Sequence, residues 1–149
     1  MFEIASVLLN LSLSTPNPDT NLERSQPVRI AHSIKVSNGV GATIHVDPDD
    51  RPRAGQNSQL WISLTKRGGA IVPYENCNCN IEVQSLTNSS IRFILPKPSY
   101  TNEDHLGLHN YVGVVFPEAG RYNLRVVGKS KEGTFEPFEL TFPIDVSNP

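Results

Sequence analysis

The chain is poor in the residue types that mark several protein classes. Its 149 residues include two cysteines, one methionine and one tryptophan, and only 7% are aromatic. Lys and Arg number 13 against 15 Asp and Glu, giving a net charge of −2, so the basic excess of nucleic-acid-binding domains is missing. No apolar run approaches the ~20 residues that a membrane-spanning helix needs. We therefore expect neither a nucleic-acid partner nor a spanning helix.

Turn-forming residues and β-formers are plentiful. The sequence has 12 prolines and 10 glycines, while Val, Ile, Thr and Phe dominate the segments between them. Branched and aromatic side chains of this kind favour strands, and the short spacing of the turn residues leaves little room for helices. A chain of this length is expected to form one domain with a sizeable core. The composition thus predicts an all-β domain.

Three segments differ in character along the chain. Residues 1–14 contain an apolar run, Ile4 to Leu13, of the length found in signal peptides, but Glu3 is acidic and no Lys or Arg precedes the run. We interpret 1–14 as a truncated signal segment, with a short N-terminal strand as the alternative. Residues 15–29 are polar, rich in proline and without periodicity, which is typical of a linker or disordered arm. The β-sandwich domain is predicted over 30–147.

Alternation of apolar and polar residues recurs in this domain at the spacing expected of a sandwich. The clearest case is the segment from Phe138 to Val146, where Pro143 indicates an edge strand or a bulge because it cannot donate a backbone hydrogen bond. Glu118 to Tyr122 has the pattern of a tyrosine corner, which requires a Greek-key crossover. We predict an immunoglobulin-like Greek-key β-sandwich of seven or eight strands, with residues 96–110 as its longest loop.

Both cysteines lie in one alternating segment, Cys77 to Gln84. In a strand, Cys77 and Cys79 share a face with Ile81 and Val83. Three interpretations stay open. The cysteines could be buried core residues, since free cysteine is often buried. They could form a strained disulfide, because Cα atoms two strand residues apart lie near the upper limit for such a bond. As thiolates, they could bind a soft ion such as Cu(I) or Zn(II).

Four histidines extend the set of candidate metal ligands. His105 and His109 are four residues apart, so a helical turn would align them, although Gly107 weakens that turn. His32 and His45 belong to neighbouring early segments and could approach each other across strands. For His105 and His109, which lie in a long polar loop, solvated histidines are the alternative. The predicted metal ligands are therefore Cys77, Cys79, His32, His45, His105 and His109.

Several motifs together resemble those of a known family. The segments Pro52 to Gln56, Leu60 to Leu64 and Gly68-Gly69 are similar to the first half of bacterial immunoglobulin-like modules. The segments Gly120 to Val126 and Phe138 to Ile144 are similar to their last half. Among these modules the chain most resembles the exported CopC-like and YtkA-like domains, some of which bind copper. The resemblance implies a secreted or periplasmic β-sandwich and makes copper a candidate ligand.

A narrower pattern resembles a set of cyanobacterial secreted proteins without an assigned activity. It comprises Ala31-His32, Val40 to His45, Leu64 to Gly69 and Cys77 to Cys79. In copper-resistance proteins of this fold a mature N-terminal histidine supplies its amine and its imidazole to Cu(II). Here His32 could do so only after cleavage following Ala31. A methionine-rich Cu(I) site is absent, because the sole methionine is Met1.

The functional prediction follows from the fold and from the lack of a catalytic motif. The sequence contains no Gly-x-Ser-x-Gly, no phosphate-binding glycine loop and no His-Glu-x-x-His. We expect a non-catalytic module in an extracytoplasmic space, either the periplasm or the thylakoid lumen, and no cofactor. It would act as a monomer or weak oligomer that presents loops or an edge strand to a protein partner, which could be membrane-associated. The alternative is a copper- or other soft-metal-binding protein.

Overall fold

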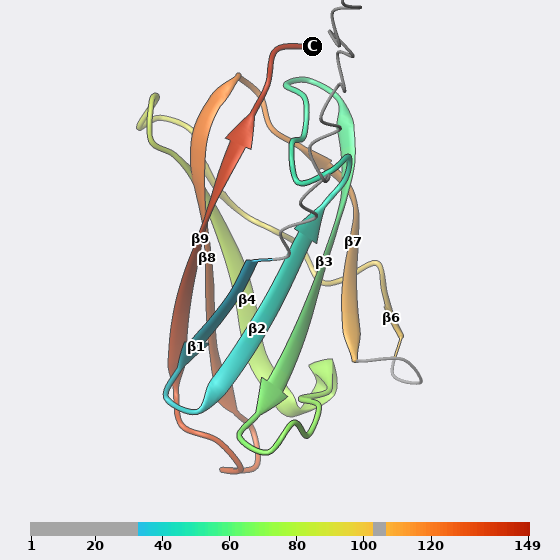
Figure 1. The fold of residues 1–149 in the computed structure, drawn as a ribbon, viewed down its shortest axis with the longest axis vertical. Coiled ribbons are helices and arrows are strands. Elements are labelled where there is room, and N and C mark those ends of the chain that lie inside the picture. The colour runs from blue at the N-terminus through green and yellow to red at the C-terminus, as the bar shows by residue number, and fades with distance from the viewer. Residues whose placement is uncertain (1–32, 103–106) are drawn as a thin grey trace, which may run out of the picture.

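Two antiparallel sheets stacked face to face form the part of the chain that the structure describes (Figure 1). The structure is a computed structural model that describes residues 33–102 and 107–149. One sheet has the order β1-β2-β3-β7-β6 and the other has the order β5-β4-β8-β9. The strands are β1 (Ser33–Ser37), β2 (Val40–Val46), β3 (Asn57–Lys66), β4 (Cys77–Ser85), β5 (Arg92–Ile94), β6 (Tyr100–Asn102), β7 (Leu108–Val115), β8 (Gly120–Ser130) and β9 (Phe138–Val146).

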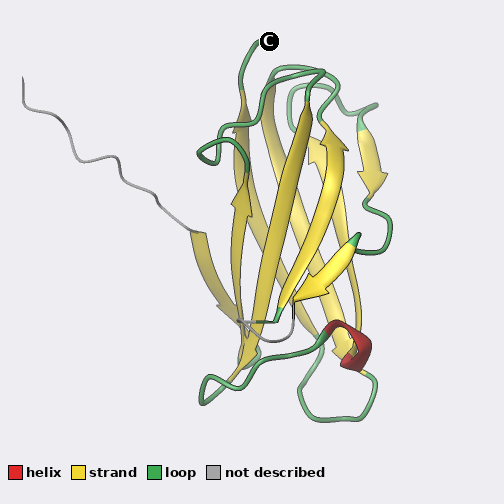
Figure 2. Ribbon diagram, turned by 90° about the vertical axis from the view of Figure 1, so that its right-hand side faces the viewer, coloured by secondary structure: helices red, strands yellow, loops and turns green. Residues whose placement is uncertain are grey.

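This order is that of an immunoglobulin sandwich. Strands β2, β3, β7 and β6 occupy the places of A, B, E and D, and β4, β8 and β9 occupy those of C, F and G. β5 extends the second sheet beside β4, and β1 is an addition at the edge of the first sheet. The predicted all-β sandwich is therefore confirmed. The chain crosses between the sheets after β3, after β5 and after β7, as the two views of the ribbon show (Figures 1 and 2).

Nine strands are present in the described ranges, more than the seven or eight predicted. The difference lies in two short edge strands, β1 and β6, of which β6 lies inside the predicted long loop. After β3 the chain makes one isolated bridge, between Ile71 and Thr65. The only helical element in these residues is the 3-10 turn η1 (Tyr74–Asn76). Within them, no helix has the length and apolar character needed to cross a membrane.

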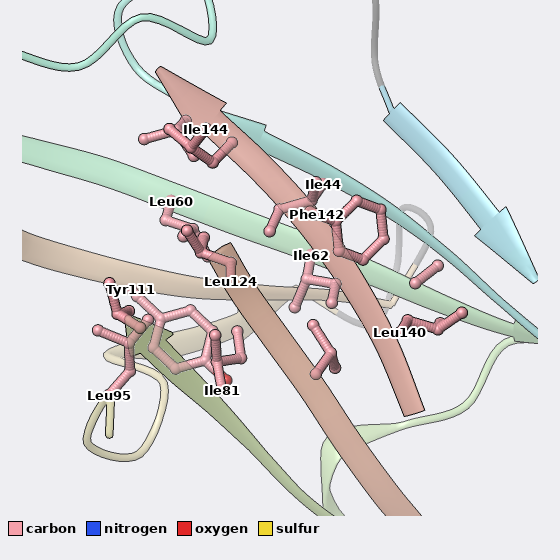
Figure 3. Packing of buried hydrophobic residues seen from close by; sticks show 14 of the residues in the cluster. Ile44, Leu60, Ile62, Ile81, Leu95, Tyr111, Leu124, Leu140, Phe142 and Ile144 are labelled. Atoms are coloured by element: carbon pink, nitrogen blue, oxygen red, sulfur yellow. The ribbon is translucent and has the colours of Figure 1, made fainter. Parts of the chain in front are cut away.

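The core is built from the inward-facing residues of both sheets (Figure 3). Burial alternates strictly along β2, where Val40, Ala42, Ile44 and Val46 are buried. The same holds along β9, in which Pro143 stands on an edge strand as predicted. Because each fully buried aliphatic or aromatic side chain contributes roughly 1.5–3 kcal/mol, this shared layer is the main source of stability.

The outer face of the second sheet carries a continuous row of charges. Glu82 on β4 lies between Arg92 and Arg125, with N–O distances of 2.7 and 3.6 Å. Arg125 also donates two hydrogen bonds to Glu139 on β9, at 2.5 and 2.8 Å. These hydrogen bonds lower the pKa of Glu139. The row therefore crosses β5, β4, β8 and β9, and its charges make this face the solvent-exposed side of the sheet.

A tyrosine corner fixes the crossover from β7 to β8, as the sequence predicts. Tyr122 is fully buried, and its hydroxyl donates to the carbonyl oxygen of Glu118 at 2.8 Å. The backbone N–H of Glu118 donates back to the same hydroxyl at 3.3 Å. The ring of Tyr122 packs edge-on against Phe116, with ring centroids 5.2 Å apart. The corner thus joins the core to the loop that connects the sheets.

We predict that Tyr122→Phe lowers the free energy of unfolding by ~1–2 kcal/mol, because the Glu118 carbonyl and N–H lose their partner while the ring stays in place. Urea unfolding followed by circular dichroism measures this change. Tyr100→Phe is the matched control, since Tyr100 is half-exposed and its hydroxyl accepts a hydrogen bond from the Gln59 side chain at the surface. Equal losses in both variants would contradict the role of the corner.

Candidate functional site

The two cysteines form a disulfide within β4. Cys77 and Cys79 are bonded to each other, and their Cα atoms lie 5.2 Å apart, less than the ~6.6 Å that two residues span in a regular strand. Both face the interior, as the alternation predicts. Cys77 is buried and Cys79 is partly buried beside the core. Of the three interpretations that the sequence leaves open, the structure contains the disulfide.

A glycine on the neighbouring strand makes room for this disulfide. Gly128 on β8 pairs with Cys79 on one side and with Phe138 on the other. A Cβ atom at Gly128 would lie 2.6 Å from the Cys79 sulfur and 2.7 Å from the Phe138 ring, closer than van der Waals contact allows.

The disulfide also decides whether the two cysteines can bind a metal ion. Since thiolates are the ligands of soft metals, Cys77 and Cys79 can bind such an ion only after the disulfide is reduced.

His45 lies on the outer face of the first sheet and is held by two carboxylates. Its Nε2 lies 2.9 Å from Asp47 Oδ1, and its Nδ1 lies 2.9 Å from Asp50 Oδ1. The imidazole also packs against the ring of Trp61 on β3, with ring centroids 5.4 Å apart. Asp50 additionally accepts a hydrogen bond from the backbone N–H of Val46. His45 therefore organises the turn that follows β2.

His109 is on β7 and faces the interior. It is 1% exposed, it pairs across the sheet with Ile62, and its ring lies edge-on to Tyr74 at 5.3 Å. Burial lowers the pKa of His109, although a hydrogen bond with the backbone of Val72 and the charge of Glu75 oppose the shift. Its Nε2 is buried and has no hydrogen-bond partner among the residues that the structure describes. His109 is thus a neutral core histidine of this fold.

The predicted ligands are distributed over different parts of the sandwich. His45 is on the outer face of the first sheet, whereas the disulfide and His109 face the interior from opposite sheets. In residues 33–102 and 107–149 no group of three or more His, Cys, Asp or Glu side chains is placed to hold a metal ion. His32 and His105, like the segments 1–14 and 15–29, lie outside the described residues, so the predictions made for them stay predictions.

A different feature, which the sequence did not single out, is an apolar opening between the sheets. On the side formed by β5 and β7, a cavity of about 140 Å³ lies between the strands. Its lining is mainly apolar and aromatic, and its residues are Phe93, Leu95, Pro96, Lys97, Ser99, Tyr111, Val112, Gly113, Val114 and Val115. We call this cavity and its rim the open seam. Figure 3 shows two of its side chains, Leu95 and Tyr111, at one margin of the core.

Two exposed aliphatic side chains line the open seam. Val112 on β7 is 59% exposed and Val115 on the same strand is 39% exposed. Burial raises the pKa of Tyr111, so its hydroxyl stays uncharged. Lys97 is then the single charged side chain of the lining. The arrangement can therefore bind an apolar group with little electrostatic cost.

The opposite side of the sandwich is closed. There β1 lies along β2 and reaches across to β9, so that the ammonium group of Lys35 stands 5.8 Å from the centre of the Phe142 ring (Figure 1). β1 also exposes two aliphatic side chains, Ile34 and Val36. They point away from the core on the outer face of the first sheet, opposite Thr43 and Gly41 of β2.

Comparison with known proteins identifies the fold. No family model matches the chain, and no curated protein matches it. Among solved structures, FetP of uropathogenic Escherichia coli strain F11 has a TM-score of 0.55 at 10% identity, covering 80% of this chain and 95% of FetP. That FetP was expressed recombinantly in the periplasm of E. coli. A copper-bound FetP variant gives the same TM-score and identity, covering 77% of this chain and 94% of its own.

A DUF4426 family protein of Pseudomonas aeruginosa is also similar, with a TM-score of 0.48 and 9% identity over 76% of this chain and 96% of its own. At these identities the FetP matches show a shared β-sandwich fold.

The low pKa of His109 predicts that stability falls in mild acid. The unfolded chain takes up a proton near pH 6.5, whereas folded His109 does so only at lower pH, so the fold loses stability as pH drops below ~6.5. Urea unfolding between about pH 7.5 and 5.5 measures the slope. His109→Gln is expected to show a shallower slope. An unchanged slope in this variant would contradict the account.

Proposed function

We propose that this protein is a non-catalytic binding module of an extracytoplasmic compartment that docks a protein partner on its open seam. The observation that carries the proposal is the contrast between its two sides. On one side β1 lies along β2 and reaches β9, while the other side exposes Val112 and Val115 in the lining of an apolar cavity. Exposed aliphatic side chains that gather beside an unfilled cavity mark interaction sites more often than scattered ones do.

The compartment is inferred from the disulfide. Disulfides persist in oxidising spaces such as the periplasm and are rare in the cytosol, and the Cys77–Cys79 bond is buried against the core. The expression of FetP in a periplasm, for a protein of the same fold, supports the same inference. The resemblance to secreted cyanobacterial and CopC-like domains agrees with it.

The test compares two pairs of equivalent surface changes. We predict that Val112→Lys with Val115→Lys abolishes capture of the partner, because two charged groups would have to be desolvated in the apolar lining. Affinity capture from the protein's own cells, after chemical cross-linking and with quantitative mass spectrometry, measures a loss of at least tenfold.

The matched control is Ile34→Lys with Val36→Lys, which places the same charges on exposed valine and isoleucine positions of β1. This control should capture the partner as the unchanged protein does. Equal capture by all three proteins, or equal loss in both variants, would contradict docking at the open seam.

Soft-metal binding is the second candidate function. Two sulfurs on one strand face could bind Cu(I) once reduced, and a FetP variant of the same fold binds copper. In this candidate Cys77 and Cys79 supply the thiolates, and His32 and His105, which lie outside the described residues, are additional candidates.

We predict for this candidate that reduced protein retains about one Cu(I) per chain after desalting without oxygen, whereas Cys77→Ser with Cys79→Ser retains far less. Elemental analysis together with a protein assay measures the ratio. The oxidised protein is the control for adventitious copper. Equal copper in the reduced protein and the double variant would exclude a site at these cysteines.

A further inference from the structure

We propose that the open seam takes an extended segment of the partner, which adds as a strand beside β7 and places one apolar side chain in the cavity. This inference rests on the proposed function and specifies the chemistry of the partner. Addition of a strand to a sheet edge gives affinity through backbone hydrogen bonds, and a side-chain pocket gives specificity. The open seam offers both.

The free backbone edge arises where β6 stops. β6 pairs with β7 only from Leu108 to Asn110. Beyond that point the chain bonds to β7 through Ser99, whose N–H donates to the Asn110 carbonyl and whose hydroxyl accepts from the Val112 N–H. From Val112 to Val115, β7 has β3 on one side and, within the described residues, no strand on the other.

Prolines keep that place vacant. The segment that leads from β5 to β6 contains Pro96 and Pro98, which cannot donate backbone hydrogen bonds and therefore cannot extend β6 along β7. A segment from another molecule could therefore lie in line with β6 and pair with this part of β7, where no strand of the described residues does so.

Gly113 lets another backbone come close. It lies in the irregular part of β7 with φ of +74°, a conformation that favours glycine, and nothing lies within 4 Å of the position its Cβ would occupy. A glycine inside a strand often marks close approach of a second backbone. The neighbouring Val112 and Val115 remain exposed on either side of it.

The cavity sets the side chain that the partner provides. Its volume of about 140 Å³ matches one aliphatic side chain, and Phe93, Leu95, Tyr111 and Val114 supply apolar contacts around it. Lys97 stands in the lining without an accompanying acidic residue, so an Asp or Glu beside the apolar residue of the partner would be favoured. The partner segment is thus extended, with a central Leu- or Ile-sized residue and an acidic flank.

Two other edge strands, β9 and β1, are less suited to strand addition. β9 contains Pro143 and is faced by β1, and β1 itself carries Lys35. Proline, lysine and covering segments are the usual devices that protect an edge. The edge from Val112 to Val115 carries neither lysine nor proline.

The experiment uses synthetic strand peptides on the full-length protein. Each peptide alternates Thr and Val, has a guest residue at its centre, and carries either two Glu or two Lys next to the guest. The guest is Leu or Ala. Isothermal titration gives the affinity, and backbone amide shifts in NMR give the location.

The Leu peptide with Glu flanks should bind at least tenfold more tightly than its Ala counterpart, since three more carbons are buried. The amide shifts should be confined to residues 93–99 and 111–115. Equal binding of Leu and Ala guests, or shifts centred on another edge, would overturn the inference.

Two variants separate the cavity from the charge. Leu95→Phe fills the cavity and should remove the preference for Leu over Ala, and its urea unfolding shows whether the fold is kept. Lys97→Glu changes only an exposed side chain and should reverse the preference for Glu flanks at low salt. Retention of both preferences in these variants would also overturn the inference.

Failure of the inference can be told apart from failure of the proposed function. If capture from cells depends on Val112 and Val115 while the peptides show no guest preference, the docking site is supported and the strand-addition mode is refuted. If the peptides bind as expected while the Lys substitutions leave the amount of captured partner unchanged, the proposed cellular function is refuted.

Discussion

Burial of one face of each sheet against the other is the constraint on which the rest of this structure depends. It requires strict alternation along β2, β3, β4, β8 and β9, and it leaves charge free to occupy the outer faces. The row from Arg92 through Glu82 and Arg125 to Glu139 exists because those positions point away from the core. The open seam is where this burial is incomplete, since β5 and β6 are too short to cover the margin between the sheets.

Strong alternation made much of the fold predictable. The segment Cys77 to Gln84 reveals its inward face because every second residue is small or apolar, and β9 does so over nine residues. The tyrosine corner was predictable because Tyr122 and Glu118 interact over four residues of chain. In such cases the determining contacts are local or strictly periodic.

Features that depend on contacts distant in sequence were not predictable. β6 has three residues, and its pairing to β7 is decided by where the chain returns from β5. The placement of His109 inside the core depends on Ile62 and Tyr74, which are remote in sequence. The open seam combines side chains of β5, β7 and the segment between β5 and β6, so no linear motif announces it. Pro96, Pro98 and Gly113 are the residues that could have indicated the open seam, but each one taken alone is typical of an ordinary loop or bulge.

The close approach of Gly128 to the Cys79 sulfur and the Phe138 ring links three strands through a single missing side chain. In related sequences these positions should change together: a residue larger than glycine at 128 would have to accompany a smaller residue at 79 or 138. Such covariation would trace the inheritance of the disulfide independently of the cysteines themselves. It would also separate lineages that lost the bond from lineages that never had it.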